Sequence, residues 1–268
     1  MAEATFNPNE LVIEKVRAVE EYDIATNELL GRYTQIEDPT LQFSADATDV
    51  VDARNSPIVT FYNAQSGTFG FTNSLFSVDL AASQFGATKV VADADNKLTT
   101  KVSETIPIGS DGTVKLKYVP VGTKGAEISS VRVINGDNSF GKKYVVSSTA
   151  GDGKFTISAA DKKITLPTGT TGKVFVNYER ETDKAVKITK TSDSVPEVKS
   201  LLIHVILRDP CNTNVVYAGI ISCPRAQIDP SSIEIGLNPD SKHAASYLLR
   251  KAYCDEDGKL VDIIIVGD

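Results

Sequence analysis

The segment from residue 60 to residue 86 constrains the fold of this chain most, because it predicts two strands followed by one short helix. In residues 68–71 large apolar and small side chains alternate, as in a half-buried strand. The helix signals are the cap candidates Thr72, Asn73 and Ser74 and an apolar stripe of Leu75, Val78, Ala82 and Phe85 at helical spacing. Gly86 stands where a left-handed C-cap belongs. The sequence therefore predicts a helix at about residues 74–85.

Almost all of the remaining sequence indicates strands and turns, so we expect a mainly β protein. Its architecture is predicted to be a two-sheet β-sandwich or half-barrel with that one helix at its flank. Residues 90–102 are expected to form a polar connection. The predicted strands are residues 10–23, 29–34, 41–44, 113–118, 173–178, 201–208, 215–223, 231–237 and 260–266. In residues 10–23 the spacing of Val12, Val16 and Val19 also fits a helix, but their β-branched side chains favour a strand. Residues 201–208 are nearly all apolar, which predicts burial on both faces.

The chain of 268 residues is long enough for a sizeable core, and we expect a single β-domain over residues 1–268. From residue 106 threonine, glycine and lysine become frequent, and Asp-Gly and Asn-Gly turns separate short alternating segments. Residues 106–195 are thus either an elaborated part of this domain or an immunoglobulin-like insertion. Residues 1–9 are predicted to be a loose arm.

The charge balance argues against nucleic-acid binding, because the formal net charge is −7 and phosphate affinity comes mainly from clustered lysine and arginine. The first residues show neither the basic region nor the apolar core of a signal peptide, which predicts synthesis and folding in a cytoplasm. No apolar run reaches the length of a membrane span. The three cysteines, Cys211, Cys223 and Cys254, are odd in number and far apart, which favours reduced thiols.

Catalytic signatures are lacking in the sequence: there is no phosphate-binding glycine loop and no nucleophile elbow. We interpret His204 as a core residue of a buried strand and His243 as a solvated loop residue. Residues 93–96 and 255–258 resemble calcium loops only in part, and ordinary turns explain them better. We therefore expect no enzymatic activity, no cofactor and no metal site.

Four short patterns, read in chain order, carry a resemblance to a known family. They are the turn Thr26-Asn27-Glu28-Leu29, the polar loop from Asp49 to Asn55, the strand–helix unit ending Leu80-Ala81-Ala82-Ser83-Gln84-Phe85-Gly86, and a C-terminal part with Cys223-Pro224-Arg225-Ala226, the alternating residues 231–237 and the closing strand Gly258 to Ile264. In this order they resemble the major tail tube proteins of tailed bacteriophages. Each pattern alone is weak, and their order gives the specificity.

The resemblance implies a virion structural protein without enzymatic activity. Six copies would close into a ring whose inner sheets complete one β-barrel, and stacked rings would form the tail tube through which double-stranded DNA passes without specific binding. Its partners would be further copies of the chain, the baseplate and tail terminator proteins, and the tape measure protein in the lumen, with no membrane involved. Its location would be the virion tail, after assembly in the host cytoplasm.

The same resemblance suggests which residues make contacts between subunits. The exposed loop of residues 46–56 is the candidate ring-stacking element, with Asp46, Asp49, Asp52, Arg54 and Asn55 as its contact residues. Glu234, on the polar face of the strand expected at residues 231–237, is the candidate acidic residue of the lumen.

Two other classes of protein remain open from the residues alone. One is a β-sandwich binding module such as an adhesin or a carbohydrate-binding domain, although the chain has no tryptophan to form a sugar platform. The other is a capsid or decoration protein, which would form closed shells or trimers instead of tubes.

Overall fold

The computed structural model describes residues 10–251 and 258–267. The arm expected at residues 1–9, Cys254 and the acidic run 255–257 therefore lie outside the described residues. The expected mainly β fold with one flanking helix is confirmed, and its main sheet is a nearly closed half-barrel. The chain divides into two compact units: unit 1 comprises residues 1–89 and 188–268, and unit 2 comprises Val90–Lys187.

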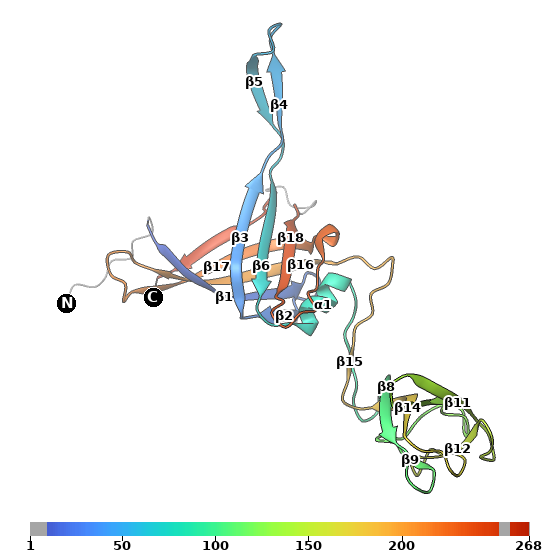
Figure 1. The fold of residues 1–268 in the computed structure, drawn as a ribbon. Helices are drawn as coiled ribbons and strands as arrows, with labels where there is room; N and C mark the ends of the chain where they lie inside the picture. The colour runs from blue at the N-terminus through green and yellow to red at the C-terminus, as the bar shows by residue number, and fades with distance from the viewer. Residues whose placement is uncertain (1–9, 252–257, 268) are drawn as a thin grey trace. The chain divides into compact units, whose positions relative to one another are not determined.

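Unit 1 is built on one large sheet, whose strand order is β2-β1-β16-β17-β18-β6-β3 with β19 paired to β17 (Figure 1). All of its pairings are antiparallel. The strands are β1 (Val12–Asp23), β2 (Leu29–Tyr33), β3 (Ile36–Ser44), β6 (Ser66–Asn73), β16 (Val198–Arg208), β17 (Val216–Ile228), β18 (His243–Leu249) and β19 (Asp262–Val266). Asn27 has the left-handed φ of 55° expected at the turn between β1 and β2.

The helix α1 (Val78–Phe85) covers the main core of unit 1. Its C-cap Gly86 has a φ of 60° as predicted, and a Cβ there would lie 2.1 Å from the Val195 carbonyl oxygen. The predicted start is wrong, because Ser77 is the N-cap. The predicted face is right for Ala82, which is buried, but Leu80 and Ala81 are buried too and Leu75 is exposed. The prediction failed at its start because Leu75 lies in a bend before the helix and Ser77 is still extended.

Three further expectations about strands are wrong. Strand β16 alternates between buried and half-buried residues, so it is buried on one face only. Residues 231–237 are not a strand: a short 3₁₀ turn, η1 (Pro230–Ser232), leads into irregular chain. Residues 90–102 are not merely a connection, because they include β7 (Val90–Val91) and the start of β8 (Leu98–Pro107).

Unit 2 has its own sheet and its own apolar core, which is centred on Phe155, Ile164 and Val174. Its strand order is β8-β14-β10-β11-β12-β13-β9, in which only the pair β11–β12 is parallel among the described residues. The strands are β8, β9 (Thr113–Lys115), β10 (Ser130–Ile134), β11 (Phe140–Val146), β12 (Lys154–Ser158), β13 (Lys163–Thr165) and β14 (Lys173–Thr182). The short pair of β7 and β15 (Val186–Lys187) stands where the chain enters and leaves the unit. The interpretation of residues 106–195 as an elaborated part of one domain or as an immunoglobulin-like insertion stays a prediction.

Candidate assembly surfaces

The segment predicted to be a ring-stacking loop is part of a β-hairpin. Strands β4 (Ala47–Val51) and β5 (Pro57–Tyr62) pair with each other, and every residue of both strands is exposed. Figure 1 shows that the hairpin extends beyond the ends of β3 and β6. The expectation of a loop over residues 46–56 is therefore wrong for Ala47–Val51. A two-stranded hairpin without a core has no buried face, so its sequence lacks the alternation that would have identified the strand.

Most of the contact residues predicted for this segment shape the hairpin itself. One carboxylate oxygen of Asp52 accepts hydrogen bonds from the backbone N–H groups of Arg54, at 2.8 Å, and Ser56, at 2.9 Å. Asn55 takes a left-handed φ of 64° at the end of the turn. Asp49 accepts a 2.6 Å bond from the Thr60 hydroxyl across the strands. The carbonyl of Asp46 closes the base by accepting from Asn63 at 2.8 Å.

Arg54 differs from these residues because its side chain is exposed at the tip of the hairpin. The part of the chain that the structure describes offers its guanidinium group neither a hydrogen bond nor an ion pair. It is therefore available to a group from another molecule.

The sequence analysis missed the apolar character of the hairpin. Val50 faces Val59 across the two strands, and Phe61, on the same face, is 60% exposed. Asp49 and Thr60 lie on the other face. The available signal was the run of β-branched and aromatic residues that follows Pro57. An exposed apolar strand face marks an interaction surface.

A second exposed apolar element is the edge strand β19. It pairs with β17 on one side, and its Ile263 and Ile264 are 64% and 53% exposed. An apolar edge strand is a template for pairing with another chain.

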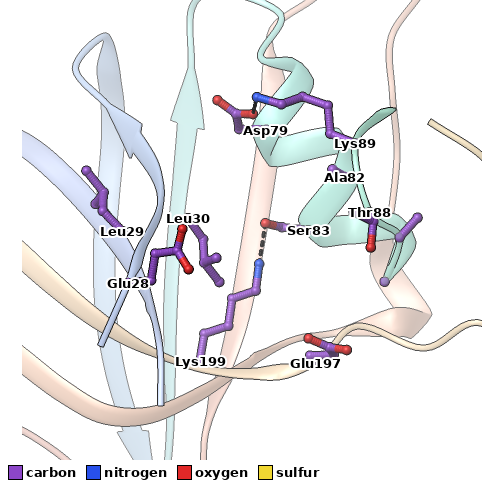
Figure 2. Close-up of a pocket in the computed structure, with 12 residues that line it drawn as sticks. Glu28, Leu29, Leu30, Asp79, Ala82, Ser83, Thr88, Lys89, Glu197 and Lys199 are labelled. Carbon is purple, nitrogen blue, oxygen red and sulfur yellow. Dashed lines mark hydrogen bonds and ion pairs between the residues drawn. The ribbon is translucent and has the colours of Figure 1, made fainter. Parts of the chain in front are cut away.

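A hollow of about 430 Å³, which we call the α1 hollow, lies between α1 and the start of β2 (Figure 2). At its floor Lys199 donates hydrogen bonds to the Ser83 hydroxyl and, over 3.0 Å, to a carboxylate oxygen of Glu21. Glu21 is fully buried and also accepts from Ser83 and from the Tyr247 hydroxyl. We call these four residues the Glu21 network.

The Glu21 network joins β1, β16, β18 and α1 through one buried carboxylate. Burial and the nearby carboxylate raise the pKa of the Tyr247 hydroxyl, and they act in the same way on Tyr33. Both phenols therefore stay protonated, and Tyr247 remains a hydrogen-bond donor. The arrangement fits a structural role: the Lys199 ammonium faces a carboxylate, and the Ser83 hydroxyl donates to that carboxylate.

The walls of the α1 hollow carry further charged and apolar side chains, which Figure 2 labels. Lys89 forms an ion pair with Asp79. Glu28 and Glu197 are exposed, and no ion pair engages them within the described residues. Their charges are therefore available to a cationic group that enters the hollow.

Both interpretations of the histidines are wrong. His204 lies on the less buried face of β16, where its Nε2 is 3.0 Å from a carboxylate oxygen of Glu20. His243 begins strand β18 and is only 2% exposed. Its Nε2 is 2.8 Å from the Gln84 amide oxygen, and its Nδ1 accepts from the Ser77 backbone. The polar residues before His243 concealed the strand that begins there.

The other residues considered for chemistry are structural or isolated. Asp93 accepts hydrogen bonds from the backbone of Asp95 and Asn96, so it holds a turn. Burial raises the pKa of the Cys223 thiol to about 12, whereas Cys211 is exposed. Within residues 10–251 and 258–267 no three His, Cys, Asp or Glu side chains are grouped so that they could hold a metal ion.

Glu234, the candidate lumen residue, is exposed in the irregular chain that follows η1. The described residues 231–237 form no strand that would direct the Glu234 side chain toward a lumen, so its role there remains a prediction.

No helix among the described residues is long and apolar enough to cross a membrane.

A search of curated proteins found no match. A comparison with protein families, in contrast, matches residues 11–263, which include three of the four sequence patterns, all but the last residue of the fourth, all of unit 2 and most of unit 1. The chain therefore belongs to the YomU/Tube protein family, a family of phage tail tube proteins.

Proposed function

We propose that this protein is the structural subunit of a phage tail tube, in which hexameric rings stack into the conduit for DNA. The family match over residues 11–263 is the observation that carries the proposal. The family implies self-assembly into a tube and a place in the virion tail, and it is not known to be enzymatic. We include in the proposal assembly in the host cytoplasm and contacts with the baseplate, the tail terminator and the tape measure protein.

Two exposed elements support closure and stacking. The apolar edge of β19 provides a surface that a neighbour's strand would cover, and the ends of the sheet order, β2 and β3, are further edges available for such pairing. Pairing between neighbours around a ring removes free edges, as in any closed barrel. The hairpin β4–β5 provides a separate contact along the tube axis.

The outer face of β6 and β18 supports the passage of DNA. On β6 the side chains of Phe69 and Phe71 point into the core, so Thr68, Gly70 and Thr72 lie on the opposite face. Their partners on β18 are Leu248, Ser246 and Ala244. These six residues are uncharged, so a lumen lined by this face would not bind phosphates. Glu234 remains our candidate for an acidic lumen residue.

Electron microscopy of the purified protein, together with a mass measurement in solution, tests the proposal. Hollow tubes or six-membered rings are expected, including when growth is seeded with tube fragments. Closed shells or isolated trimers would favour a capsid or decoration protein, and monomers that bind glycans would favour an adhesin.

Removal of the hairpin tests the contact between rings. We expect that replacing Ala47–Tyr62 by an Asn-Gly turn prevents stacking, because it removes the proposed contact along the tube axis. Among the described strands β4 and β5 pair only with each other. For the same reason the circular dichroism spectrum and the melting temperature should hardly change. Tubes of normal length from this variant would exclude a stacking role for the hairpin.

A further inference from the structure

We propose that the α1 hollow is the socket that receives the tip of the β4–β5 hairpin from the next copy along the tube. This inference rests on the proposed function, because it assumes that copies stack head to tail. It names the surface with which the hairpin makes contact.

The hairpin and the α1 hollow lie at opposite ends of the same strand. The hairpin precedes Ser66, the first residue of β6, and α1 follows soon after Asn73, its last residue. A strand of eight residues spans about 26 Å at the usual rise per residue. Figure 1 shows the hairpin beyond one end of β6 and α1 near the other end. Head-to-tail stacking requires complementary features at opposite ends of one subunit, because a heterologous interface joins two different surfaces.

The charges of the two surfaces are complementary. Arg54 is the cation at the tip of the hairpin, and it has no ion-pair partner among the described residues. The hollow contains two lysines, but Lys89 is paired with Asp79 and Lys199 with Glu21. What remains in the hollow is the pair of carboxylates of Glu28 and Glu197, which an arginine can bind through two N–H groups.

Apolar contacts supplement the ion pairs. Leu29 and Leu30, which line the hollow, are 49% and 38% exposed. The turn of the hairpin is flanked by Val51 and Ile58, which are 44% and 64% exposed. Insertion of the tip would remove both sets of aliphatic side chains from water, and it would place the arginine within a partly desolvated site.

Charge reversal with compensation tests the socket. We expect Arg54→Glu alone, and Glu28→Arg with Glu197→Arg, each to raise the protein concentration needed for tube growth at least tenfold. The triple variant should restore growth to within about threefold of the unaltered protein, because the pairs are re-formed with opposite signs. Arg132→Glu, which reverses an exposed arginine of unit 2, is the matched control and should leave growth unchanged.

A crosslinking measurement adds a direct readout. With Cys211 and Cys254 replaced by serine, Arg54→Cys and Glu197→Cys should form disulfides between copies in assembled tubes. The products should be a ladder that extends beyond dimers, because each copy would use its tip and its hollow with different neighbours.

The outcomes separate this inference from the proposed function. Normal growth of the Arg54→Glu variant, or impaired growth that the compensating changes do not restore, would overturn the socket and leave hairpin-dependent stacking intact. An unaltered protein that forms neither rings nor tubes would overturn the proposed function and the socket together.

Discussion

The two units of the chain differ in sign of charge. Unit 1 contains 13 Lys and Arg against 24 Asp and Glu, whereas unit 2 contains 15 against 11. The net charge of −7 for the whole chain thus conceals an acidic unit 1 and a basic unit 2. The argument against DNA binding from net charge therefore holds for unit 1, which carries the hairpin, the α1 hollow and the proposed lumen face.

The units also differ in how their cores are held. Unit 1 contains the Glu21 network next to an aromatic cluster that includes Phe71 and Tyr247, whose rings stack at 6.1 Å. Unit 2 has an apolar core. The Tyr178 hydroxyl of this unit donates a hydrogen bond to the Glu104 carboxylate. Burial and this hydrogen bond raise the pKa of Tyr178 to about 12. We infer that unit 2 depends mainly on packing, whereas unit 1 also depends on a buried ion pair.

The largest effect expected from this difference is in unit 2. Phe155→Ala empties the position of a fully buried ring and should lower the free energy of unfolding of unit 2 by about 4 kcal/mol. Because unit 2 has its own core, scanning calorimetry should show one transition shifted and the transition of unit 1 unchanged. A single transition that moves as a whole would show that the two units unfold together.

A somewhat smaller effect is expected from the Glu21 network. Lys199→Met keeps the volume of the side chain but leaves the Glu21 carboxylate buried without its cation, at a cost of about 3 kcal/mol. The estimate is at the low end for a buried pair because Lys199 borders the α1 hollow, where water can approach. The transition of unit 1 should shift and that of unit 2 should not.

The matched control for this variant is a lysine of unit 2. Lys142 forms its ion pair with Asp152 on the exposed surface, so Lys142→Met should produce no measurable change. Equal destabilisation by the two substitutions would contradict the distinction between the units.

The sequence was sufficient for the β character of the chain, for the helix that ends at Gly86 and for the left-handed turn at Asn27. These features depend on local chemistry: alternation, a residue that tolerates positive φ, and turn dipeptides. The helix start, and with it part of the predicted face, was wrong because the stripe was counted from Leu75, and nothing local shows that the helix begins only after Ser77.

The sequence indicates the exposure of residues 46–56 but not their conformation. The proposed stacking segment was chosen for its excess of polar residues, yet Asp49, Asp52 and Asn55 are occupied in building the hairpin. The socket could not be found from the sequence, because Glu28 and Glu197 come from distant parts of the chain that only the sheet brings together. The same holds for Glu21 and Lys199, which face each other from two paired strands.

The smallest effect expected is a pH dependence confined to unit 1. Both histidines of the chain lie there, and burial holds the pKa of His243 below its usual 6.5. The neutral ring fits its surroundings, since Nδ1 accepts from the Ser77 N–H and Nε2 can donate to Gln84. Below pH 6.5 the His243 ring therefore binds a proton in the unfolded chain but stays neutral in the folded chain. The free energy of unfolding thus falls as the pH falls.

The slope cannot exceed about 1.4 kcal/mol per pH unit for one proton, and we expect a loss of about 1 kcal/mol in unit 1 between pH 7 and pH 5.5. Calorimetry across this range should show the transition of unit 1 moving while that of unit 2, which has no histidine, stays in place. His243→Gln should remove the slope. A slope that survives in the His243→Gln variant would mean that another group of unit 1 takes up the proton, and the buried imidazole would then have no part in the acid sensitivity.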